Sequence, residues 1–185
     1  MKRTFWLALI AIVFGSILGY CVLSFTNLTP NTIEGTSWKT NLQIGKPSES
    51  VFQKAKRTKV GVFALPQEEV VYFMAVEDDE GNTLKSDQRY EITGIAPETN
   101  IWSITLYDDQ YRLVQNSIKR YHFNATTLGV DLGEAYSFTI SSEKAMGNWL
   151  PAPQEGKFVL CYRVYQPPAL FFPIQASALP RIRKL

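Results

Sequence analysis

The chain has 185 residues, of which 19 are basic and 17 acidic, and its formal net charge at pH 7 is +2. Lys2 and Arg3 supply this excess, and the balance of charges after them argues against a nucleic-acid partner. With Cys21 and Cys161 as its two cysteines, the chain has no disulfide framework of the kind found in small secreted domains.

An uncharged run of 21 residues, Phe5 to Phe25, follows the two basic residues at the start of the chain. As a helix it would extend about 31 Å, which matches the hydrocarbon core of a bilayer. The stretch from Thr26 to Ile33 carries no charge, so the positive-inside rule places the amino terminus in the cytoplasm. We therefore expect a single-pass membrane protein, with residues 5–25 in the lipid bilayer and the following domain on the side of the membrane opposite to the cytoplasm.

A cleaved secretory signal is the alternative interpretation of this run. Gly19, Tyr20 and Cys21 form a weak match to the small-x-small pattern of a cleavage site. The apolar run is longer than that of an ordinary signal, however. The segment Leu18–Cys21 is also a weak match to a lipoprotein box, because Tyr20 is bulky where a small residue is needed. We therefore expect the segment to be retained as an anchor.

Small residues recur every four positions in the same segment, at Ala11, Gly15 and Gly19. This spacing aligns them on one helix face, where they would allow a second helix to approach closely. The pattern predicts self-association through this face. Ordinary membrane composition, in which glycine is common, is the alternative explanation.

Beyond the anchor, which occupies residues 1–25, the polar residues 26–46 are expected to connect it to one domain of ordinary size, residues 47–185. The domain opens with a helix signal from Pro47 to Arg57, which combines an N-capping serine, an early acid and late basic residues. We expect this short helix to pack on the edge of a sheet.

The rest of the domain alternates β-rich runs with turn signals, at a spacing typical of an antiparallel β-sandwich or jelly roll. The expected strands are Val70–Val76, Arg89–Gly94, Ile101–Tyr107, Tyr111–Gln115, Arg120–Asn124, Tyr136–Ser141 and Phe158–Tyr165. Both faces of Ile101–Tyr107 and of Phe158–Tyr165 are fairly apolar, so these two strands are expected to lie centrally in a sheet or to line a cavity. The predicted fold class is therefore mainly β, with a short helix and one N-terminal transmembrane helix.

Several segments match the motifs of a bacterial family in the same order along the chain. They are Gly61–Leu65, Glu68–Phe73, Asp79–Gly81, Trp102–Asp108, Arg120–Tyr121, Thr127–Gly129, Asn148–Pro153 and Arg163–Tyr165. On these segments the chain resembles the family known as domain of unknown function 1214, from Val60 to Ile182. The resemblance implies a β-sandwich, jelly-roll-like fold and transfers no activity or active-site residues. The family is often fused behind a companion, domain of unknown function 1254, and this chain carries the apolar segment in its place.

Residue types suited to catalysis or metal binding are few. His122 is the single histidine, and zinc sites usually need three or four ligands drawn largely from His and Cys, so no metal or other cofactor is expected. A serine triad would need His122 as its base, and the chain has no G-x-S-x-G turn. Asp108 and Asp109 are interpreted as turn residues rather than an acid/base pair, and Asp78–Asn82 as a solvated turn rather than a calcium loop.

The most specific motif, Asn148–Pro153, places Trp149 between a hydrogen-bonding amide and the rigid Pro151 and Pro153. It predicts either one wall of a ligand pocket or a structural plug whose indole fills a gap between sheets. The candidate pocket residues are Trp102, Tyr107, Arg120, His122, Asn148, Trp149, Pro151 and Pro153. A second apolar stretch, Pro167 to Pro180, predicts either an exposed partner surface or packed core.

Together with the resemblance to a bacterial family, these features predict a protein anchored in the bacterial inner membrane. Its periplasmic module is expected to bind a small molecule or an envelope protein, rather than to act as an enzyme. One alternative is a hydrolase-like enzyme that acts on a small molecule in an interior pocket. Another is a structural envelope protein that assembles through Gly15, Gly19 and the Pro167 to Pro180 surface. The alternatives differ in whether a concave pocket exists and whether polar groups converge in it.

Overall fold

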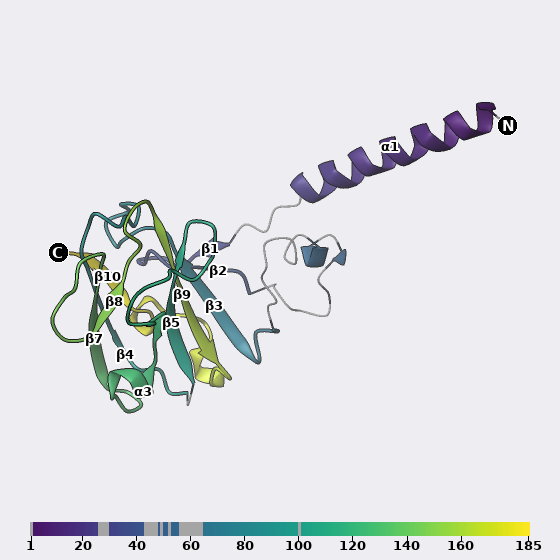
Figure 1. Cartoon of the computed structure of the whole chain (residues 1–185). Helices are drawn as coiled ribbons and strands as arrows, with labels where there is room; N and C mark the ends of the chain where they lie inside the picture. Colours follow the sequence, from purple (N-terminus) through teal and green to yellow (C-terminus); the bar gives the residue numbers. More distant parts are fainter. Residues whose placement is uncertain are drawn as a thin grey trace. The chain divides into compact units, whose positions relative to one another are not determined.

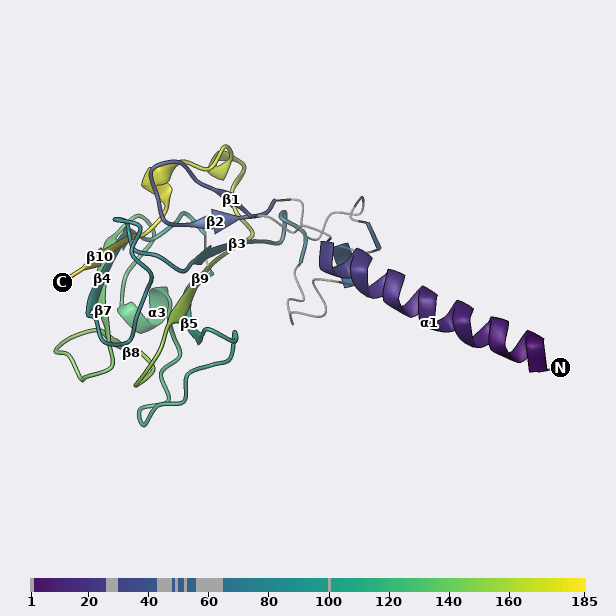
Figure 2. The ribbon, with the colours of Figure 1, turned by 90° about the horizontal axis from the view of Figure 1, so that it is seen from above.

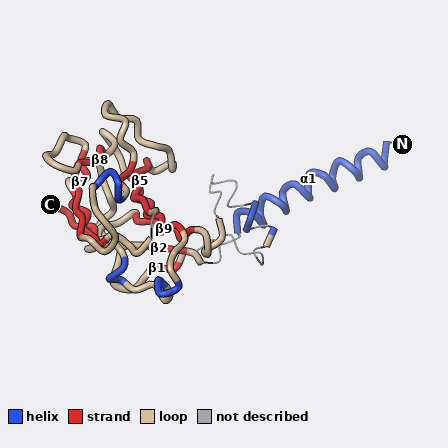
Figure 3. Tube along the Cα trace, turned by 90° about the horizontal axis from the view of Figure 1, so that it is seen from below, coloured by secondary structure: helices blue, strands red, loops and turns tan. Residues whose placement is uncertain are grey.

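The computed structural model describes residues 2–25, 30–42, 48, 50–51, 53–55, 65–99 and 101–185. The chain forms two compact units, one of Met1–Thr29 with Gln43–Leu65 and the other of Pro30–Leu42 with Pro66–Leu185. The first unit contains a long helix, and the second is built mainly of strands (Figure 1, Figure 3).

Helix α1 spans Lys2–Phe25. Its segment Arg3–Cys21 is long and apolar enough to cross a membrane, and its side chains are not buried inside the protein. A Cβ built on Gly15 or Gly19 would meet no atom within 4 Å, so the small-residue face is open. Both a membrane anchor and an N-terminal signal sequence have this length and composition.

A short helical segment follows in the same unit, at residues 51 and 53–55. Ser50 caps it reciprocally, because its Oγ accepts from the Gln53 N–H at 3.2 Å while its own N–H donates to Gln53 Oε1 at 3.0 Å. A capping serine is thus present in the region where the sequence predicts a helix. Positions 47, 49, 52, 56 and 57 of that predicted helix lie outside the described residues.

The second unit is a sandwich of two sheets (Figure 2). Its strands are β1 Asn31–Thr32, β2 Lys39–Thr40, β3 Val70–Ala75, β4 Tyr90–Ile95, β5 Trp102–Asp108, β6 His122–Phe123, β7 Ala135–Ser141, β8 Trp149–Pro151, β9 Phe158–Tyr165 and β10 Arg181–Lys184. The six-stranded sheet has the order β1-β2-β3-β9-β5-β6, and the four-stranded sheet has the order β10-β4-β7-β8. Neighbouring strands are antiparallel except β7 and β8, which are parallel. The expected mainly β fold with one N-terminal apolar helix is confirmed.

Strand β9 lies between β3 and β5 and is buried on both faces. On the inward face Tyr162 is 0% exposed, and the register places it between Phe73 of β3 and Ile104 of β5. On the outward face Val159 is 5% exposed and Cys161 is 3% exposed. The apolar character of both faces, visible in the sequence, therefore corresponds to a central strand.

Aromatic rings connect the two sheets across the core. The ring of Trp102 on β5 stacks on that of Tyr136 on β7, with 4.8 Å between the centroids. Phe123 on β6 and Phe138 on β7 approach to the same centroid distance, 4.8 Å. Because each pair joins one sheet to the other, these contacts hold the two layers together.

Trp38 lies in the stretch expected to be a polar connection, but its side chain is 0% exposed. Its indole Nε1 donates to the Pro180 carbonyl at 2.6 Å, and its ring centroid lies 5.9 Å from that of Tyr162. Strands β1 and β2 on either side of Trp38 in the sequence extend the six-stranded sheet. Residues 30–42 thus belong to the sandwich.

Two expected strands differ in the structure. Residues 111–115 form a loop that keeps one isolated bridge, from Leu113 to Tyr107. Tyr111 adopts a positive φ of 59°, which an extended strand does not accommodate. Within the expected strand Arg120–Asn124, only His122 and Phe123 are extended. Helix α3, Ala125–Leu128, follows at once and is capped by the side chain of Asn124.

The apolar stretch 167–180 is neither a continuous strand nor an entirely exposed surface. It contains two 3₁₀ helices, η1 at Ala169–Phe171 and η2 at Ala176–Ala178. Phe171 is buried against Phe73, with 6.1 Å between their ring centroids, whereas Leu170 is 92% exposed. The stretch therefore divides its side chains between core and surface.

The close approach of Tyr136 to Gly94 yields a first prediction. The two residues pair between β4 and β7, and a Cβ at Gly94 would lie 2.6 Å from Tyr136 Oη. We expect Gly94→Ala to displace the ring and lower the free energy of unfolding by about 1–3 kcal/mol. Urea denaturation measures this loss. The exposed Ser137→Ala on β7 is the control and should change little, and an unaltered midpoint for Gly94→Ala would contradict the packing described.

The burial of Cys161 yields a second prediction. Desolvation raises the pKa of its thiol to about 11, although Arg163 acts in the opposite direction. Because the pKa is raised, the thiol is protonated at pH 8 in the folded protein. In a Cys21→Ser chain we expect iodoacetamide to label native Cys161 at least a hundredfold more slowly than the urea-unfolded chain at pH 8. Similar rates in the two states would show that the thiol is accessible.

Candidate functional site

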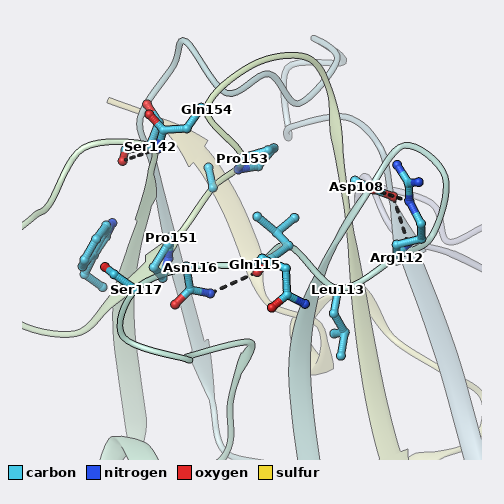
Figure 4. Close-up of a pocket in the computed structure, with 13 residues that line it drawn as sticks. Asp108, Arg112, Leu113, Gln115, Asn116, Ser117, Ser142, Pro151, Pro153 and Gln154 are labelled. Atoms are coloured by element: carbon cyan, nitrogen blue, oxygen red, sulfur yellow. Dashed lines mark hydrogen bonds and ion pairs between the residues drawn. The ribbon is translucent and has the colours of Figure 1, made fainter.

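A cavity of about 890 Å³ lies beside β8, at the edge of the four-stranded sheet. Figure 4 shows its lining, which comes from the segment between β5 and β6 and from β8 with the residues around it. The lining residues are Asp108, Arg112, Leu113, Val114, Gln115, Asn116, Ser117, Ser142, Trp149, Pro151, Ala152, Pro153 and Gln154. We call this cavity the β8 groove.

The β8 wall of the groove is held by the side chain and the carbonyl of Trp149. The indole Nε1 donates to the Ser141 carbonyl on β7 at 3.0 Å. The Trp149 carbonyl accepts from Arg120 Nη1, also at 3.0 Å. Leu150, the next residue, is 0% exposed and fills the core, so Trp149 remains half-buried at the groove. In this arrangement Leu150, rather than the indole, fills the space between the sheets.

The opposite wall begins with a tight turn at the end of β5. The Asp108 carboxylate accepts from the N–H of Gln110 at 2.9 Å and from the N–H of Arg112 at 2.8 Å. It also accepts from Arg112 Nε at 2.9 Å. The backbone N–H and the guanidinium of Arg112 hold the pKa of Asp108 below its usual range. Asp108 therefore serves as the turn residue that the sequence predicts.

Asn116 fixes the far end of the same wall. Its side-chain amide donates to the Arg120 carbonyl at 2.8 Å and to the Val114 carbonyl at 3.1 Å. Its Oδ1 accepts from the Arg120 N–H at 3.0 Å. Since Arg120 also contacts Trp149, this network links the two walls of the groove.

The surface of the groove combines apolar and uncharged hydrogen-bonding groups. Its apolar part consists of Leu113, Val114, Trp149, Pro151, Ala152 and Pro153, and its neutral polar part consists of Gln115, Asn116, Ser117, Ser142 and Gln154. The titratable lining residues are Asp108 and Arg112, which form an ion pair with each other. The groove can thus offer shape, an aromatic ring and neutral hydrogen bonds to a ligand.

Four of the candidate pocket residues come together at this place. Trp149, Pro151 and Pro153 line the groove, and Arg120 binds the Trp149 carbonyl. Asn148 directly precedes them but is exposed, and its carbonyl accepts from the Thr139 N–H at 2.8 Å.

The other three candidates lie elsewhere. Trp102 is 1% exposed in the core, and its Nε1 has no hydrogen-bond partner in the described part of the chain, so it serves in packing. Tyr107 lies on the outer face of the six-stranded sheet, where its hydroxyl accepts from Arg163 Nη2 at 2.8 Å. His122 is exposed on β6 opposite Thr105 of β5.

Sequence reasoning missed the groove residues Leu113, Gln115, Ser142 and Gln154 as site residues. The sequence predicts a strand at Tyr111–Gln115, in which Leu113 and Gln115 would pair with a neighbouring strand. One sequence signal for this wall was the segment from Asn116 to Arg120, because its Asn and Ser residues are typical of a turn.

The turn predicted at Asp78–Asn82 is present, but it is solvated only in part, because Asp78 is 2% exposed while Glu80, Gly81 and Asn82 are exposed. Asp78 Oδ1 accepts from the N–H groups of Glu80 and Asn82 at 3.0 and 2.9 Å. Asp79 pairs with Arg181 at 2.8 Å. Across residues 2–25, 30–42, 65–99 and 101–185 and the short described pieces between them, no three His, Cys, Asp or Glu side chains group as a metal site would require.

Solved structures of other proteins are similar to this chain over part of their length. The VPA0106 protein from Vibrio parahaemolyticus is similar with a TM-score of 0.59 and 24% identity, over 75% of this chain and 36% of that protein. A putative uncharacterized protein from Burkholderia cenocepacia has a TM-score of 0.45 and 14% identity, over 63% of this chain and 29% of that one. The chain thus spans about a third of the length of these proteins.

Sequence comparison identifies the family. No curated protein matches the chain. The model of a family described as proteins of unknown function, DUF1214, matches residues 69–169, which include β3 to β9 and both walls of the β8 groove. On this match, the chain belongs to the DUF1214 family.

Proposed function

We propose that this protein is a membrane-anchored module of the bacterial envelope that binds a small uncharged ligand in the β8 groove. The observation that carries the proposal is the groove itself, about 890 Å³ in volume and walled by Trp149, Pro151 and Pro153. This volume lies within the range of roughly 300–1,000 Å³ that is usual for small-molecule sites.

The chemistry of the lining favours a ligand that is neutral and both apolar and hydrogen-bonding. The half-buried indole and the two prolines provide a rigid apolar wall. Gln115, Ser117 and the other amide and hydroxyl groups can donate and accept hydrogen bonds. Asp108 and Arg112 neutralise each other, so the lining residues that the structure describes carry no unpaired charge to select an ion.

The groove supports binding better than hydrolysis. A serine hydrolase would need a base within hydrogen-bond reach of its nucleophile. Ser117 and Ser142 line the groove, but His122 is not among the lining residues, and Asp108 is engaged by Arg112 and its turn. The enzyme alternative therefore lacks a set of groups with distinct catalytic roles in this cavity.

Helix α1 supports the anchoring part of the proposal. The side chains from Arg3 to Gly15 are exposed and the segment is apolar, as contact with lipid would require. Lys2 and Arg3 at its start favour a cytoplasmic amino terminus, which leaves the sandwich in the periplasm.

The ligand proposal is tested by extracting the full chain from bacterial membranes in mild detergent and analysing copurified small molecules by mass spectrometry. We expect an uncharged molecule to accompany the wild type and to fall at least tenfold in Trp149→Ala, because the aromatic wall is lost. Met146→Ala is the matched control, since Met146 is 97% exposed in the neighbouring loop and does not line the groove.

Both variants should keep the melting temperature of the wild type within a few degrees, which separates ligand loss from unfolding. Equal retention of the molecule in all three proteins, or loss in Met146→Ala alone, would contradict a ligand site at the β8 groove.

The topology proposal has a separate test. Alkaline phosphatase fused after Leu185 should be active, because it folds in the periplasm, and the same fusion to β-galactosidase should be inactive. Mass measurement of the membrane-extracted fusion should show that residues 5–25 are retained. An active β-galactosidase fusion, or a cleaved amino terminus, would contradict the anchored arrangement.

A further inference from the structure

Arg163 occupies the outer face of the six-stranded sheet, away from the core and from the β8 groove. Its strand β9 places it opposite Tyr72 of β3 on one side and Ser103 of β5 on the other. Its guanidinium carbon lies 6.0 Å from the centroid of the Tyr72 ring and 5.6 Å from that of Tyr107. The cation is therefore flanked by two aromatic rings that restrict its position.

Two hydrogen bonds orient the guanidinium. Nη1 donates to Thr105 Oγ1 at 3.0 Å, and Nη2 donates to the Tyr107 hydroxyl at 2.8 Å. Both acceptors are neutral. Since a guanidinium has five N–H donors, these two bonds leave three for another acceptor.

Arg163 has no carboxylate partner in the described residues. Arg112, Arg181 and Arg183, by contrast, pair with Asp108, Asp79 and Glu91 at 2.9, 2.8 and 2.7 Å. The raised pKa of Cys161, about 11, keeps the neighbouring thiol neutral at pH 7, so it supplies no countercharge.

The surroundings of this cation are only partly hydrated. Arg163 itself is partly buried, and its neighbours on the same face, Thr105, Val159 and Cys161, are 7%, 5% and 3% exposed. A charge in such a place is costly without a partner, and a guanidinium with several free donors is suited to pair with a planar or tetrahedral oxyanion.

We propose that Arg163 is the centre of an oxyanion site on the outer face of the six-stranded sheet, with Tyr72 and Tyr107 as its aromatic walls. The site takes a carboxylate or phosphate group, through the guanidinium N–H groups that Thr105 and Tyr107 leave unused. The oxyanion belongs either to a free small molecule or to the headgroup of an anionic lipid. The proposal is independent of the β8 groove, which has a neutral lining and shares no residue with this site.

Inorganic phosphate serves as the probe, added at constant ionic strength to the ¹⁵N-labelled full chain in non-ionic detergent. We expect saturable shifts of the backbone amide resonances of residues 159–165, with a dissociation constant below about 10 mM. Arg163→Gln should weaken this binding at least tenfold. Arg163→Lys keeps the charge but lacks the planar fork, and it should weaken binding at least threefold.

Arg112→Gln is the matched control, because Arg112 is an exposed arginine already paired with Asp108. It should bind phosphate as the wild type does, and so should Trp149→Ala, which separates this site from the groove. Unsaturable shifts in the wild type, or equal weakening in Arg163→Gln and Arg112→Gln, would overturn the proposal. If Arg163→Gln does not fold, the result for Arg163→Lys alone decides the test. Phosphate binding by Arg163→Lys equal to that of the wild type would contradict a role for the planar guanidinium.

Nanodiscs distinguish the two sources of the oxyanion. The full chain is placed in discs of phosphatidylcholine alone or of phosphatidylcholine with phosphatidylglycerol. If a lipid headgroup is the ligand, the resonances of residues 159–165 shift in the anionic discs without added phosphate, and this shift is lost in Arg163→Gln. If the ligand is a free anion, only added phosphate shifts them. If the resonances shift neither in the anionic discs nor on addition of phosphate, the proposal is overturned.

Discussion

The burial of β9 on both faces is the constraint on which the rest of the sandwich depends. Its inward side chains meet the aromatic core, where Tyr162 contacts Trp38, Phe73 and Trp102. Its hydrogen bonds position β3 on one side and β5 on the other. Because β5 is fixed in this way, the turn at Asp108 and one wall of the β8 groove are fixed with it, and the outward face of β9 carries Arg163.

Sequence reasoning predicted correctly those elements whose signal lies within a single short stretch of the chain. Strand β9 has the expected bounds, Phe158–Tyr165, because eight consecutive residues of β-forming type need no distant partner to be recognised. Strands β1 and β2 were missed because two-residue strands have no measurable periodicity. The burial of Trp38 depends on Pro180, which is 142 positions away and adjoins it only after folding.

Sequence reasoning identified residues of one of the two walls of the β8 groove. The chemistry of Trp149, Pro151 and Pro153 was evident as a rigid apolar wall, and these residues do line the groove. The opposite wall was not evident, because the backbone reversal at Tyr111 places a loop where the sequence predicts a strand. Arg163 illustrates a different limit. Its position on a strand could be predicted from the sequence. Whether a carboxylate lies near it depends on which distant side chains share its sheet face, and the described structure places none there.

The prolines of the groove also affect how the domain behaves toward other copies of itself. Strand β8 is an edge strand, and exposed strand edges are the places where folded chains recruit one another into extended sheets and aggregates. Pro151 has no N–H to donate, and the neighbouring Trp149 carbonyl already accepts from Arg120. The residues that shape one wall of the groove therefore also leave this edge a poor template for intermolecular strand pairing, which favours solubility at high local concentration.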